Sequence, residues 1–461
     1  MFYRKIIDKL VNWKNKPNRK PLILRGARQV GKTTAVLMFG KENFSSILTI
    51  NLENIAHRRL FDAPLSIEDF ETIIRIHFQV SLSPETLIFI DEIQHSVHLL
   101  QLLRFFKEER PHIPVICAGS LLEAMISKGG YQIPVGRVCY EYMYPLTFFE
   151  YLNATGKIEM LDYLKNIHID SVIPESIHFS LLKEINQYSL IGGMPEVINE
   201  YHRSKDFQEL PVIYTSLING YIEDVYKYTS HTQSKYSQFV IEHAPRYAGE
   251  RISYSKFSNS QYGSREISAS FDLIEKVLLL NRVRGTVSKK LPIESRLKMP
   301  PKIIFLDIGL VNTFLGINPI DFLNSKDLNA FYNGKIAEQV IGQHLISQRM
   351  NPQDNIFYWA KPKAQGSAEV DFCFSYKGKF IGLEVKSGKP GTLKSLVEFS
   401  KAVHNPILVR VYAGQMRIDQ LSSTQRYFLS IPFYLIPWLR ILLDEMIEGK
   451  WGRTKNNFTT L

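Results

Sequence analysis

The chain has 461 residues, of which 45% are hydrophobic and 22% are charged, and this composition excludes a mostly disordered chain. Lysine and arginine number 56 against 45 aspartates and glutamates, which gives a formal net charge of +11, and three widely separated cysteines argue against a disulfide framework or a structural zinc site. No apolar run approaches the roughly 20 residues that a membrane-spanning helix needs, so we expect no membrane-spanning segment.

The first 150 residues have the pattern of an α/β domain. The opening stretch MFYRKIIDKLVNWKNK has basic residues throughout and lacks the apolar core of a signal peptide, so we expect a cytoplasmic protein. Beyond it, short β-branched stretches alternate with helical ones, which predicts a mainly parallel sheet with helices between the strands. The expected strands are residues 21–25, 47–52, 86–90, 115–118 and 137–142.

Two further units are expected before residue 300. Residues 151–230 have helical periodicity and the turn GGMP, which indicates a helical extension. Residues 231–300 contain a helix near 235–243, a Ser/Tyr/Gly-rich stretch, a helix near 268–280 and a hairpin, in an order that resembles a winged helix. Interleaved tyrosines and basic residues suit nucleic acid but also suit any solvated surface, and the candidates for phosphate contacts are Tyr254, Lys256, Arg265 and Lys276.

The last part of the chain is expected to form a second α/β domain over residues 301–437. A strand at 302–306, a helix at 329–349 and a run of strands over 356–385 support this division. An amphipathic helix at 438–448 and a polar tail then close the chain, as a segment over 438–461. With the α/β domain at the start of the chain, which is expected to span residues 1–150, this makes five segments.

A phosphate-binding loop follows the first expected strand. Residues 26–33, GARQVGKT, fit the pattern G-x-x-x-x-G-K-[ST] between an apolar strand and a helix, as this motif requires. The glycines let the backbone N–H groups turn towards phosphate oxygens at a helix N-terminus. Lys32 is expected to reach the β- and γ-phosphates of ATP, and Thr33 to ligate Mg²⁺. The candidate nucleotide-binding residues are Gly26, Arg28, Gly31, Lys32, Thr33, Thr34 and Asp91.

A second motif lies at the distance from this loop that a P-loop ATPase requires. Residues 87–92, LIFIDE, are an apolar strand that ends in two carboxylates. Asp91 is expected to hold Mg²⁺, directly or through water, and Glu92 to polarise the attacking water. The alternative reading of such a pair is a helix N-cap, which the intact phosphate loop makes the weaker one.

Two more catalytic candidates come from later segments. The strand VICAG ends at Ser120, whose hydroxyl is expected either to contact the γ-phosphate or the water, or to cap a helix. Arg137, in VGR, is expected either to act as an arginine finger, in cis or from a neighbouring subunit, or to form a structural ion pair.

Taken together, these segments resemble the prokaryotic AAA-type ATPases that carry a C-terminal domain of unknown function. The resemblance rests on GARQVGKTT, LIFIDEIQ, VICAGS, GRVCYEYMYPLTFFEYL, GGMPEV and PKIIFLDIGL, and it spans about residues 20–390. It implies an α/β fold: an AAA+ or archaeal-ATPase core with a parallel sheet, then a helical extension, a winged-helix-like unit and a restriction-endonuclease-like domain.

The C-terminal part contains a pattern similar to that of the PD-(D/E)xK nucleases. Asp371 lies on one expected strand, and Glu384 and Lys386 lie two apart on the next, so their side chains share a face. Glu338, on the preceding helix, is the usual additional acid of that pattern. Glu338, Asp371 and Glu384 are therefore candidate metal ligands, and Lys386 is expected to orient a water or to stabilise phosphate charge.

The alternatives to a nuclease are a chance E-V-K match and a nuclease-like fold that only binds. Residues 1–20, 235–300 and 377–417 each carry a net charge of +6, which suits a nucleic-acid backbone or a solvated surface. The basic residues around the pattern are Lys377, Lys379, Lys389 and Lys394.

The sequence therefore favours an ATPase that uses ATP and Mg²⁺ and is coupled to a basic C-terminal module that binds nucleic acid, with DNA as the candidate partner, and has a candidate cleavage site. The rival hypothesis is a slow nucleotide-dependent switch whose C-terminal part is a protein-interaction platform with a silent E-x-K remnant. An arginine finger supplied in trans would require a homo-oligomer.

Overall fold

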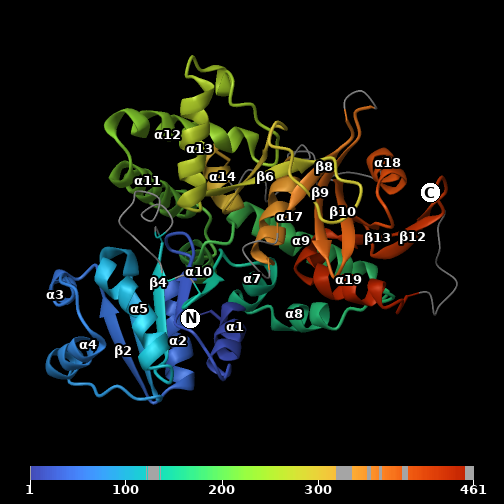
Figure 1. The fold of residues 1–461 in the computed structure, drawn as a ribbon. Helices are drawn as coiled ribbons and strands as arrows, with labels where there is room; N and C mark the ends of the chain where they lie inside the picture. The colour runs from blue at the N-terminus through green and yellow to red at the C-terminus, as the bar shows by residue number, and fades with distance from the viewer. Residues whose placement is uncertain are drawn as a thin grey trace. The chain divides into compact units, whose positions relative to one another are not determined.

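The computed structural model describes residues 2–120, 122, 134, 136–317, 335–349, 355–362, 366–386 and 393–451 (Figure 1). The chain forms two compact units. The first, here called the N-terminal unit, comprises Met1–Leu146, Gly220–Ser234 and Asp272–Leu279. The second, the C-terminal unit, comprises Thr147–Asn219, Lys235–Phe271 and Leu280–Leu461.

The N-terminal unit is built on a five-stranded parallel sheet in the order β2-β3-β4-β1-β5. All five expected strands are present, with bounds that differ by at most two residues. They are β1 (Leu22–Arg25), β2 (Ser46–Asn51), β3 (Thr86–Asp91), β4 (Val115–Gly119) and β5 (Cys139–Tyr142).

Helices cover both faces of this sheet, because its central strands are apolar on both sides. On β3, Ile88 and Ile90 share a core with Leu99 and Leu103 of α5, while Leu87 points to Gly40 of α2 on the other face. The helical elements of this part are α1 (Ile6–Lys14), α2 (Lys32–Asn43), α3 (Ile55–Arg59), α4 (Ile67–Ile73), η1 (Ile74–Phe78), η2 (Ile93–His95) and α5 (Val97–Glu109).

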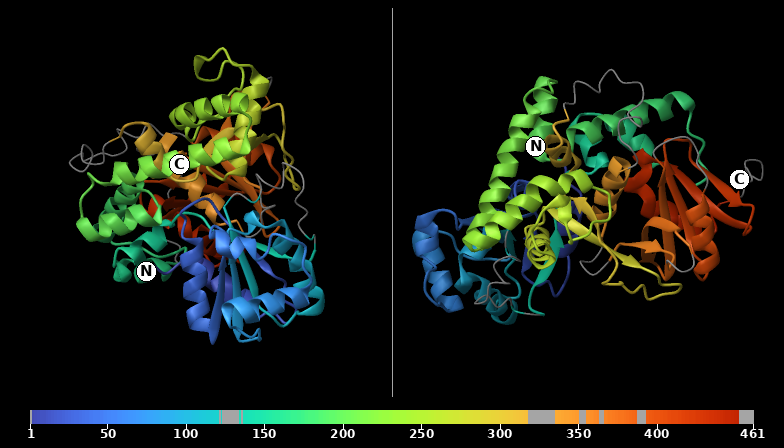
Figure 2. Two further views of the ribbon diagram at one scale, coloured as in Figure 1. Left: turned by 90° about the vertical axis from the view of Figure 1, so that its left-hand side faces the viewer. Right: turned by 90° about the horizontal axis from the view of Figure 1, so that it is seen from above.

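The C-terminal unit contains an eight-stranded mixed sheet in the order β12-β13-β11-β10-β9-β8-β6-β7 (Figure 2). Strands β8, β9 and β10 form an antiparallel series, whereas β10, β11 and β13 are parallel. The strands are β6 (Leu280–Thr286), β7 (Lys302–Phe305), β8 (Phe357–Ala360), β9 (Glu369–Tyr376), β10 (Lys379–Lys386), β11 (Ile407–Tyr412), β12 (Arg417–Leu421) and β13 (Arg426–Pro432).

Two helices pack on opposite faces of this sheet. An added Cβ at Gly342 of α17 would lie 3.1 Å from Phe372, whereas Cys373, the next residue on β9, shares a core with Phe399 of α18.

The helical elements that follow β5 in the chain are α7 (Phe148–Ala154), α8 (Ile158–Lys165), α9 (Glu175–Ile191), α10 (Pro195–Ser204), α11 (Leu210–Tyr228), α12 (His231–His243), η3 (Ala244–Tyr247), η4 (Phe257–Asn259), α13 (Ser264–Lys276), α14 (Ile308–Phe314), α17 (Lys335–Ser347), α18 (Lys394–Ala402), η6 (Phe433–Trp438) and α19 (Leu439–Ile447).

The turn GGMP and the segment FLDIGL meet inside the C-terminal unit. The buried carboxylate of Asp307 caps α14 and accepts hydrogen bonds from Gly193 N at 2.6 Å and from the Tyr214 hydroxyl at 2.7 Å. Gly192 has φ 85°, and an added Cβ there would lie 2.3 Å from Asp307 Oδ1. The turn therefore requires glycine for its backbone conformation and for this close approach.

Residues 235–300, where a hairpin is expected, contain one strand, β6. It pairs with β7, the strand expected at 302–306, and with β8, so it belongs to the large sheet. The winged-helix-like unit and the division into five segments stay predictions. The helix expected at 268–280 runs from Ser264 to Lys276, and residues 329–334 of the helix expected at 329–349 lie outside the described residues. Among the residues that the structure describes, no helix has the length and apolarity needed to cross a bilayer.

Candidate functional site

The phosphate loop follows β1 and leads into α2, as its motif predicts. Gly31, the N-cap of α2, has φ 92°, which is the left-handed region that glycine enters without strain. Gly26 lies so close to Met143 that an added Cβ would be 2.5 Å from the Met143 carbonyl oxygen. Both glycines of the motif are therefore required by the local backbone.

Lys32 lies folded along this loop. Its side chain is buried, and Nζ donates hydrogen bonds to the carbonyl oxygens of Gly26 at 3.0 Å and Ala27 at 2.8 Å. Burial lowers the pKa of Lys32, and the carboxylates of Glu92 and Asp91 oppose that shift. Phosphate oxygens are stronger acceptors for an ammonium than these two carbonyls, so the loop holds Lys32 ready for an anionic ligand.

Thr33 and Asp91 join the two predicted motifs. The Thr33 hydroxyl donates a 2.7 Å hydrogen bond to Asp91 Oδ2, and Asp91 Oδ1 accepts the Glu92 N–H at 3.1 Å. Burial raises the pKa of Asp91, and the bond from Thr33 opposes this. Two adjacent ligand oxygens of an octahedral Mg²⁺ ion lie roughly 2.9 Å apart, so the carboxylate and hydroxyl fit that ion.

Glu92 and Ser120 are brought together at the carboxyl ends of β3 and β4. Glu92 has φ 53°, an uncommon conformation for a residue other than glycine, and its Oε2 lies 3.5 Å from the Ser120 hydroxyl. Gln94 Nε2 donates a second hydrogen bond to Glu92 Oε2. Gln94 is almost fully buried, and sequence reasoning missed it although it lies two residues after Glu92 in the string DEIQ.

Arg28 is held by a helix that the sequence did not connect with the loop. Its Nε lies 2.8 Å from Oδ2 of Asp224 on α11, and its carbonyl oxygen accepts a 3.1 Å hydrogen bond from the Tyr221 hydroxyl. Asp224 is fully buried, and burial raises its pKa while Arg28 opposes the shift. Thr34, the last candidate of the loop, is exposed at the first turn of α2.

Arg137 does not lie at this site. β5 runs parallel to β1 with Cys139 opposite Leu22. Arg137 precedes β5 and therefore lies beside the amino ends of these strands. The phosphate loop follows the carboxyl end of β1, and the length of β1 separates its two ends by about 13 Å, at 3.3 Å per residue. Arg137 instead pairs with Glu108 at 2.7 Å. The expectation of an arginine finger in cis is therefore wrong, because Arg137 lies beside the amino ends of the strands, whereas the alternative expectation, a structural ion pair, is what the structure has.

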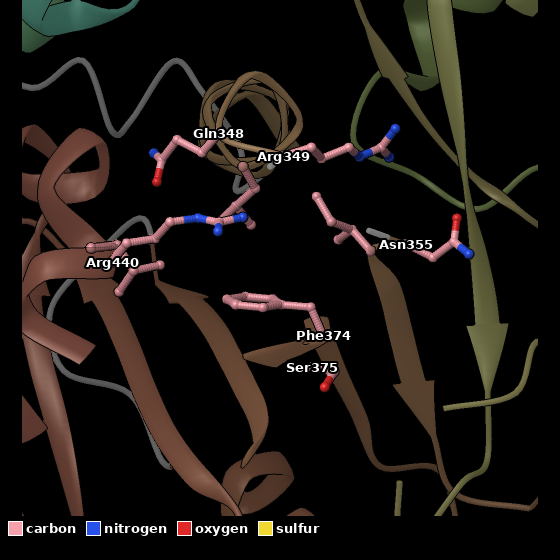
Figure 3. A pocket seen from close by; sticks show the side chains of 9 residues that line it. Gln348, Arg349, Asn355, Phe374, Ser375 and Arg440 are labelled. Atoms are coloured by element: carbon pink, nitrogen blue, oxygen red, sulfur yellow. The ribbon is translucent and has the colours of Figure 1, made fainter. Parts of the chain in front are cut away.

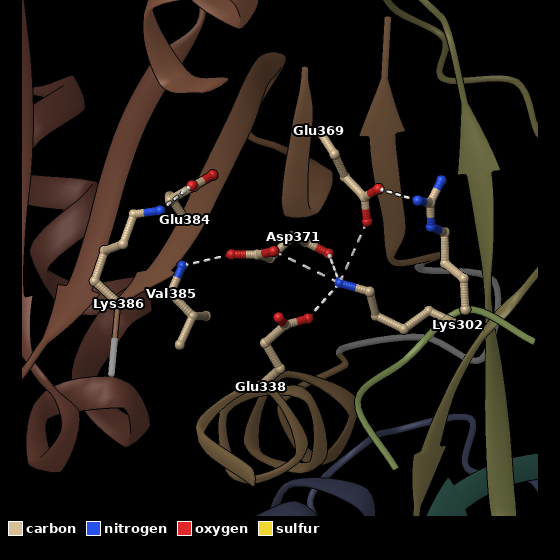
Figure 4. Close-up of polar contacts among 8 residues, drawn as sticks. Lys302, Glu338, Glu369, Asp371, Glu384, Val385 and Lys386 are labelled. Carbon is tan, nitrogen blue, oxygen red and sulfur yellow. Dashed lines mark hydrogen bonds and ion pairs between the residues drawn. The ribbon is translucent and has the colours of Figure 1, made fainter. Parts of the chain in front are cut away.

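The nuclease-like pattern is assembled in the C-terminal unit, but around a lysine (Figure 4). Lys302 Nζ lies 2.5 Å from Glu338 Oε2, 3.7 Å from Asp371 Oδ1 and 3.8 Å from Glu369 Oε1. Burial acts to lower the pKa of Lys302, but Glu338 and Asp371 more than offset it, so the pKa rises and the ammonium stays charged. Sequence reasoning missed Lys302 and Glu369.

The E-x-K pair lies beside these residues. Lys386 Nζ donates a 2.7 Å hydrogen bond to Glu384 Oε1, and Asp371 Oδ2 accepts the Val385 N–H at 2.7 Å. Burial, with a further contribution from Asp371, raises the pKa of Glu384 to about 7. Glu384 and Lys386 share a face of β10, as their spacing predicts.

The donor set of this cluster does not fit a divalent metal as arranged. Lys302 occupies the space between the carboxylates, and Glu384 is turned towards Lys386. Within the described ranges, no group of three or more His, Cys, Asp and Glu side chains is arranged to hold a metal ion.

The basic candidates are distributed over the chain. Tyr254, Lys256 and Arg265 belong to the C-terminal unit, whereas Lys276 belongs to the N-terminal unit. Lys377 forms an ion pair with Asp444 at 2.6 Å. Lys389 lies outside the described residues, and the other two candidates near the E-x-K pair are at the start of β10 and of α18, namely Lys379 and Lys394.

Two hollows lie in the C-terminal unit. A small one of about 20 Å³ is bordered by Arg349, Phe374 and Arg440 (Figure 3), which is room for about one water molecule. A larger, open hollow of about 770 Å³ is bordered by five basic or titratable side chains and one acid, namely Lys289, Lys290, Lys401, His404, Arg426 and Glu294.

Three family matches cover successive parts of the chain. Residues 18–152 match the family described as an AAA domain. Residues 182–321 match a domain of unknown function (DUF8612), and residues 333–434 match another (DUF4143). A comparison with curated proteins finds no match.

Solved structures with some similarity include the following two. The RuvB Holliday junction branch migration motor of Thermotoga maritima is 15% identical, and the match covers 61% of this chain and 90% of that one at a TM-score of 0.28. The Aeropyrum pernix ORC1 protein, solved in complex with DNA, is 11% identical over 69% of this chain and 92% of that one, at a TM-score of 0.30. These scores are too low to bear on function.

The match to the AAA domain agrees with the phosphate loop, the parallel sheet and the Thr33–Asp91 contact described above. This chain therefore carries a nucleotide-binding, AAA-type P-loop ATPase domain over residues 18–152, followed by two segments that match domains of unknown function.

Proposed function

We propose that this protein hydrolyses ATP with Mg²⁺ at the site formed by the phosphate loop and the ends of β3 and β4. The observation that carries the proposal is the convergence of Lys32, the Thr33–Asp91 pair and the Glu92–Ser120 pair at one edge of the sheet. A phosphate-binding loop without hydrolysis would not require a second carboxylate beside the metal position.

In this proposal each side chain has a separate task. The Lys32 ammonium leaves the carbonyls of Gly26 and Ala27 and binds the β- and γ-phosphates, while Thr33 and Asp91 hold the metal ion. Bound Mg²⁺ neutralises charge on the phosphate oxygens. Glu92 accepts a proton from, and orients, the attacking water, and Ser120 and Gln94 fix the position of the Glu92 carboxylate.

Phosphate release from ATP·Mg²⁺ by the full chain tests this directly. We expect Lys32→Ala to reduce the rate at least about 100-fold, in keeping with the loss of a charged transition-state contact. Lys41→Ala, a change in an exposed lysine at the end of the same helix, is the matched control and should retain the wild-type rate. A Lys32→Ala protein with normal turnover would exclude the site.

The second part of the proposal is that the C-terminal unit binds nucleic acid, and specifically DNA. The larger hollow supports this, because four lysine or arginine side chains and His404 border it against the single acid Glu294. The rival proposal is that this unit is a platform for a protein partner and that nucleotide acts as a slow switch.

The salt dependence of DNA binding separates the two proposals. If Lys289, Lys290 and Arg426 neutralise phosphates, the logarithm of the association constant falls linearly with the logarithm of salt concentration. The double variant Lys289→Glu/Lys290→Glu should weaken binding and reduce that slope, while Lys41→Glu/Arg75→Glu, two exposed residues of the N-terminal unit outside the three basic segments, serves as a charge-matched control. No measurable DNA binding, together with nucleotide-dependent binding of a protein, would favour the platform.

Arg137 keeps one proposed catalytic role, that of an arginine finger supplied to a neighbouring copy in a homo-oligomer. Its side chain is 46% exposed and its partner Glu108 is also at the surface, so little free energy is lost when Arg137 leaves Glu108 to contact a phosphate. Mixing Arg137→Ala chains with Lys32→Ala chains tests this. Recovery of phosphate release in the mixture, absent from either variant alone, is the expected result.

A further inference from the structure

Lys302 is an unusual residue in the C-terminal unit because its charged end is buried. It is the first residue of β7, its side chain is 2% exposed, and its Nζ also donates a 3.3 Å hydrogen bond to the Asp371 carbonyl oxygen. The rings of Tyr358 and Phe372 lie over the ammonium, at 6.0 and 5.1 Å from their centroids. A buried ammonium is stable only when anions compensate the loss of water, and three carboxylates surround this one.

Two basic side chains offset most of the negative charge of the cluster without a metal ion. Glu338, Glu369 and Asp371 bring three negative charges, and Lys302 together with Arg251, which lies 3.1 Å from Glu369, brings two positive ones. Two positive charges are what a divalent cation would supply. Two amino-acid side chains therefore provide the charge that the nuclease pattern assigns to a metal.

The positions of the carboxylate oxygens also argue against a bound divalent metal ion. A divalent cation binds carboxylate oxygens at 2.0–2.6 Å, and the Lys302 Nζ already lies 2.5 Å from Glu338 Oε2 and 3.7 Å from Asp371 Oδ1. The other Asp371 oxygen accepts the Val385 N–H, and Glu384 Oε1 accepts from Lys386. Glu384 Oε2 is buried without a hydrogen bond, but one oxygen does not make a metal site. An ion could enter only after Lys302 had moved.

We propose that Lys302 is the resident cation of this carboxylate cluster and excludes divalent metal from it. The C-terminal unit consequently does not cleave phosphodiester bonds through Asp371, Glu384 and Lys386, and the nuclease-like arrangement serves as a scaffold. Neutralising Lys302 while keeping its volume creates a divalent-cation site among Glu338, Glu369 and Asp371. This inference is independent of ATP hydrolysis, which takes place in the other unit.

Binding of Mn²⁺ to the full chain without nucleotide tests the proposal. Every protein in the test carries Asp91→Asn, so that the Thr33–Asp91 position does not contribute. In this background we expect Lys302→Met to gain one Mn²⁺ per chain, and the additional change Asp371→Asn to remove it. A Lys302→Met protein that folds and binds no more Mn²⁺ than its parent would contradict the proposal.

A comparison that leaves Lys302 in place covers the case in which Lys302→Met does not fold. Without the Lys302 change, the parent and Asp371→Asn proteins should bind Mn²⁺ equally and should both leave supercoiled plasmid uncut in Mg²⁺ or Mn²⁺. If the parent bound Mn²⁺ or nicked the plasmid and Asp371→Asn abolished this, Lys302 would not exclude the metal and the proposal would be overturned.

Discussion

The hydroxyl of Thr33 donates a 2.7 Å hydrogen bond to the carboxylate of Asp91, a residue 58 positions further along the chain. This contact joins the phosphate loop after β1 to the end of β3, with β4 between the two strands in the sheet. It places a hydroxyl and a carboxylate at the separation of neighbouring ligands of one Mg²⁺ ion. The metal position of the proposed ATPase is thus already formed by the fold.

Asp91→Asn should raise the Mg²⁺ concentration that ATP binding requires. An amide keeps the shape and can still accept the Thr33 hydrogen bond, but it lacks the negative charge that a hard cation prefers. We expect at least about tenfold higher Mg²⁺ concentration for half-maximal ATP binding, measured by calorimetry. Asp62→Asn, an exposed carboxylate of the same unit, is the control. Equal Mg²⁺ curves for Asp91→Asn and wild type would remove Asp91 from the metal site.

Arg28→Ala should destabilise the N-terminal unit. Asp224, which is fully buried, would keep Lys227, at 3.7 Å and 57% exposed, as its remaining ion-pair partner among the described residues. Loss of one partner of a buried pair costs about 3–5 kcal/mol, and because Arg28 is 34% exposed we expect a smaller loss of about 1–3 kcal/mol in urea unfolding.

The control for Arg28→Ala is an exposed pair of similar geometry. Arg203, 73% exposed, lies 2.7 Å from Glu200, and Arg203→Ala should change the stability by about 0.5 kcal/mol or less. If both variants lost the same stability, burial of Asp224 would not be the cause.

His344 should make the stability of the C-terminal unit depend on pH. Its Nε2 accepts the Phe148 N–H at 3.0 Å, and burial lowers the pKa of His344 from 6.5 to about 4. The unfolded chain therefore binds more protons than the native one between these values, and stability falls as the pH drops from about 6.5 towards 4, by up to about 3 kcal/mol.

Urea unfolding at pH 7 and pH 5 measures this effect. His344→Gln, which does not titrate in this range, should show a smaller loss between the two pH values than wild type, and His202→Gln, an exposed histidine of α10, should behave as wild type. An unchanged pH dependence in His344→Gln would assign the loss to other groups.

The sequence alone predicts the N-terminal sheet and most of its site. Strands 21–25 and 86–90 carry the two motifs at their carboxyl ends, and the structure has Lys32, Thr33, Asp91 and Glu92 close together there, while their roles stay predictions. The E-x-K pair is also predicted correctly as a shared face of β10, because it depends only on the alternation of side chains along a strand.

The residues that the sequence does not reveal owe their roles to distant contacts. Asp224 lies in a helix whose pattern gives no sign of the phosphate loop, and Lys302 opens the apolar string KIIF, where a lysine reads as an exposed strand end. The carboxylate partners of Lys302 lie 36, 67 and 69 residues further along the sequence. Of the alternatives for Arg137, the structure has the ion pair, and the finger in cis is excluded because Arg137 lies at the start of a strand parallel to β1.

The most direct test of the central claim is phosphate release from ATP·Mg²⁺ by wild type and Glu92→Gln, with ATP binding measured on the same samples. Glutamine can still accept hydrogen bonds from Ser120 and Gln94 but cannot take a proton from water, so we expect unchanged ATP affinity and a rate at least about 100-fold lower. A Glu92→Gln protein that binds and hydrolyses ATP as wild type does would contradict the assignment of this site as an ATPase centre.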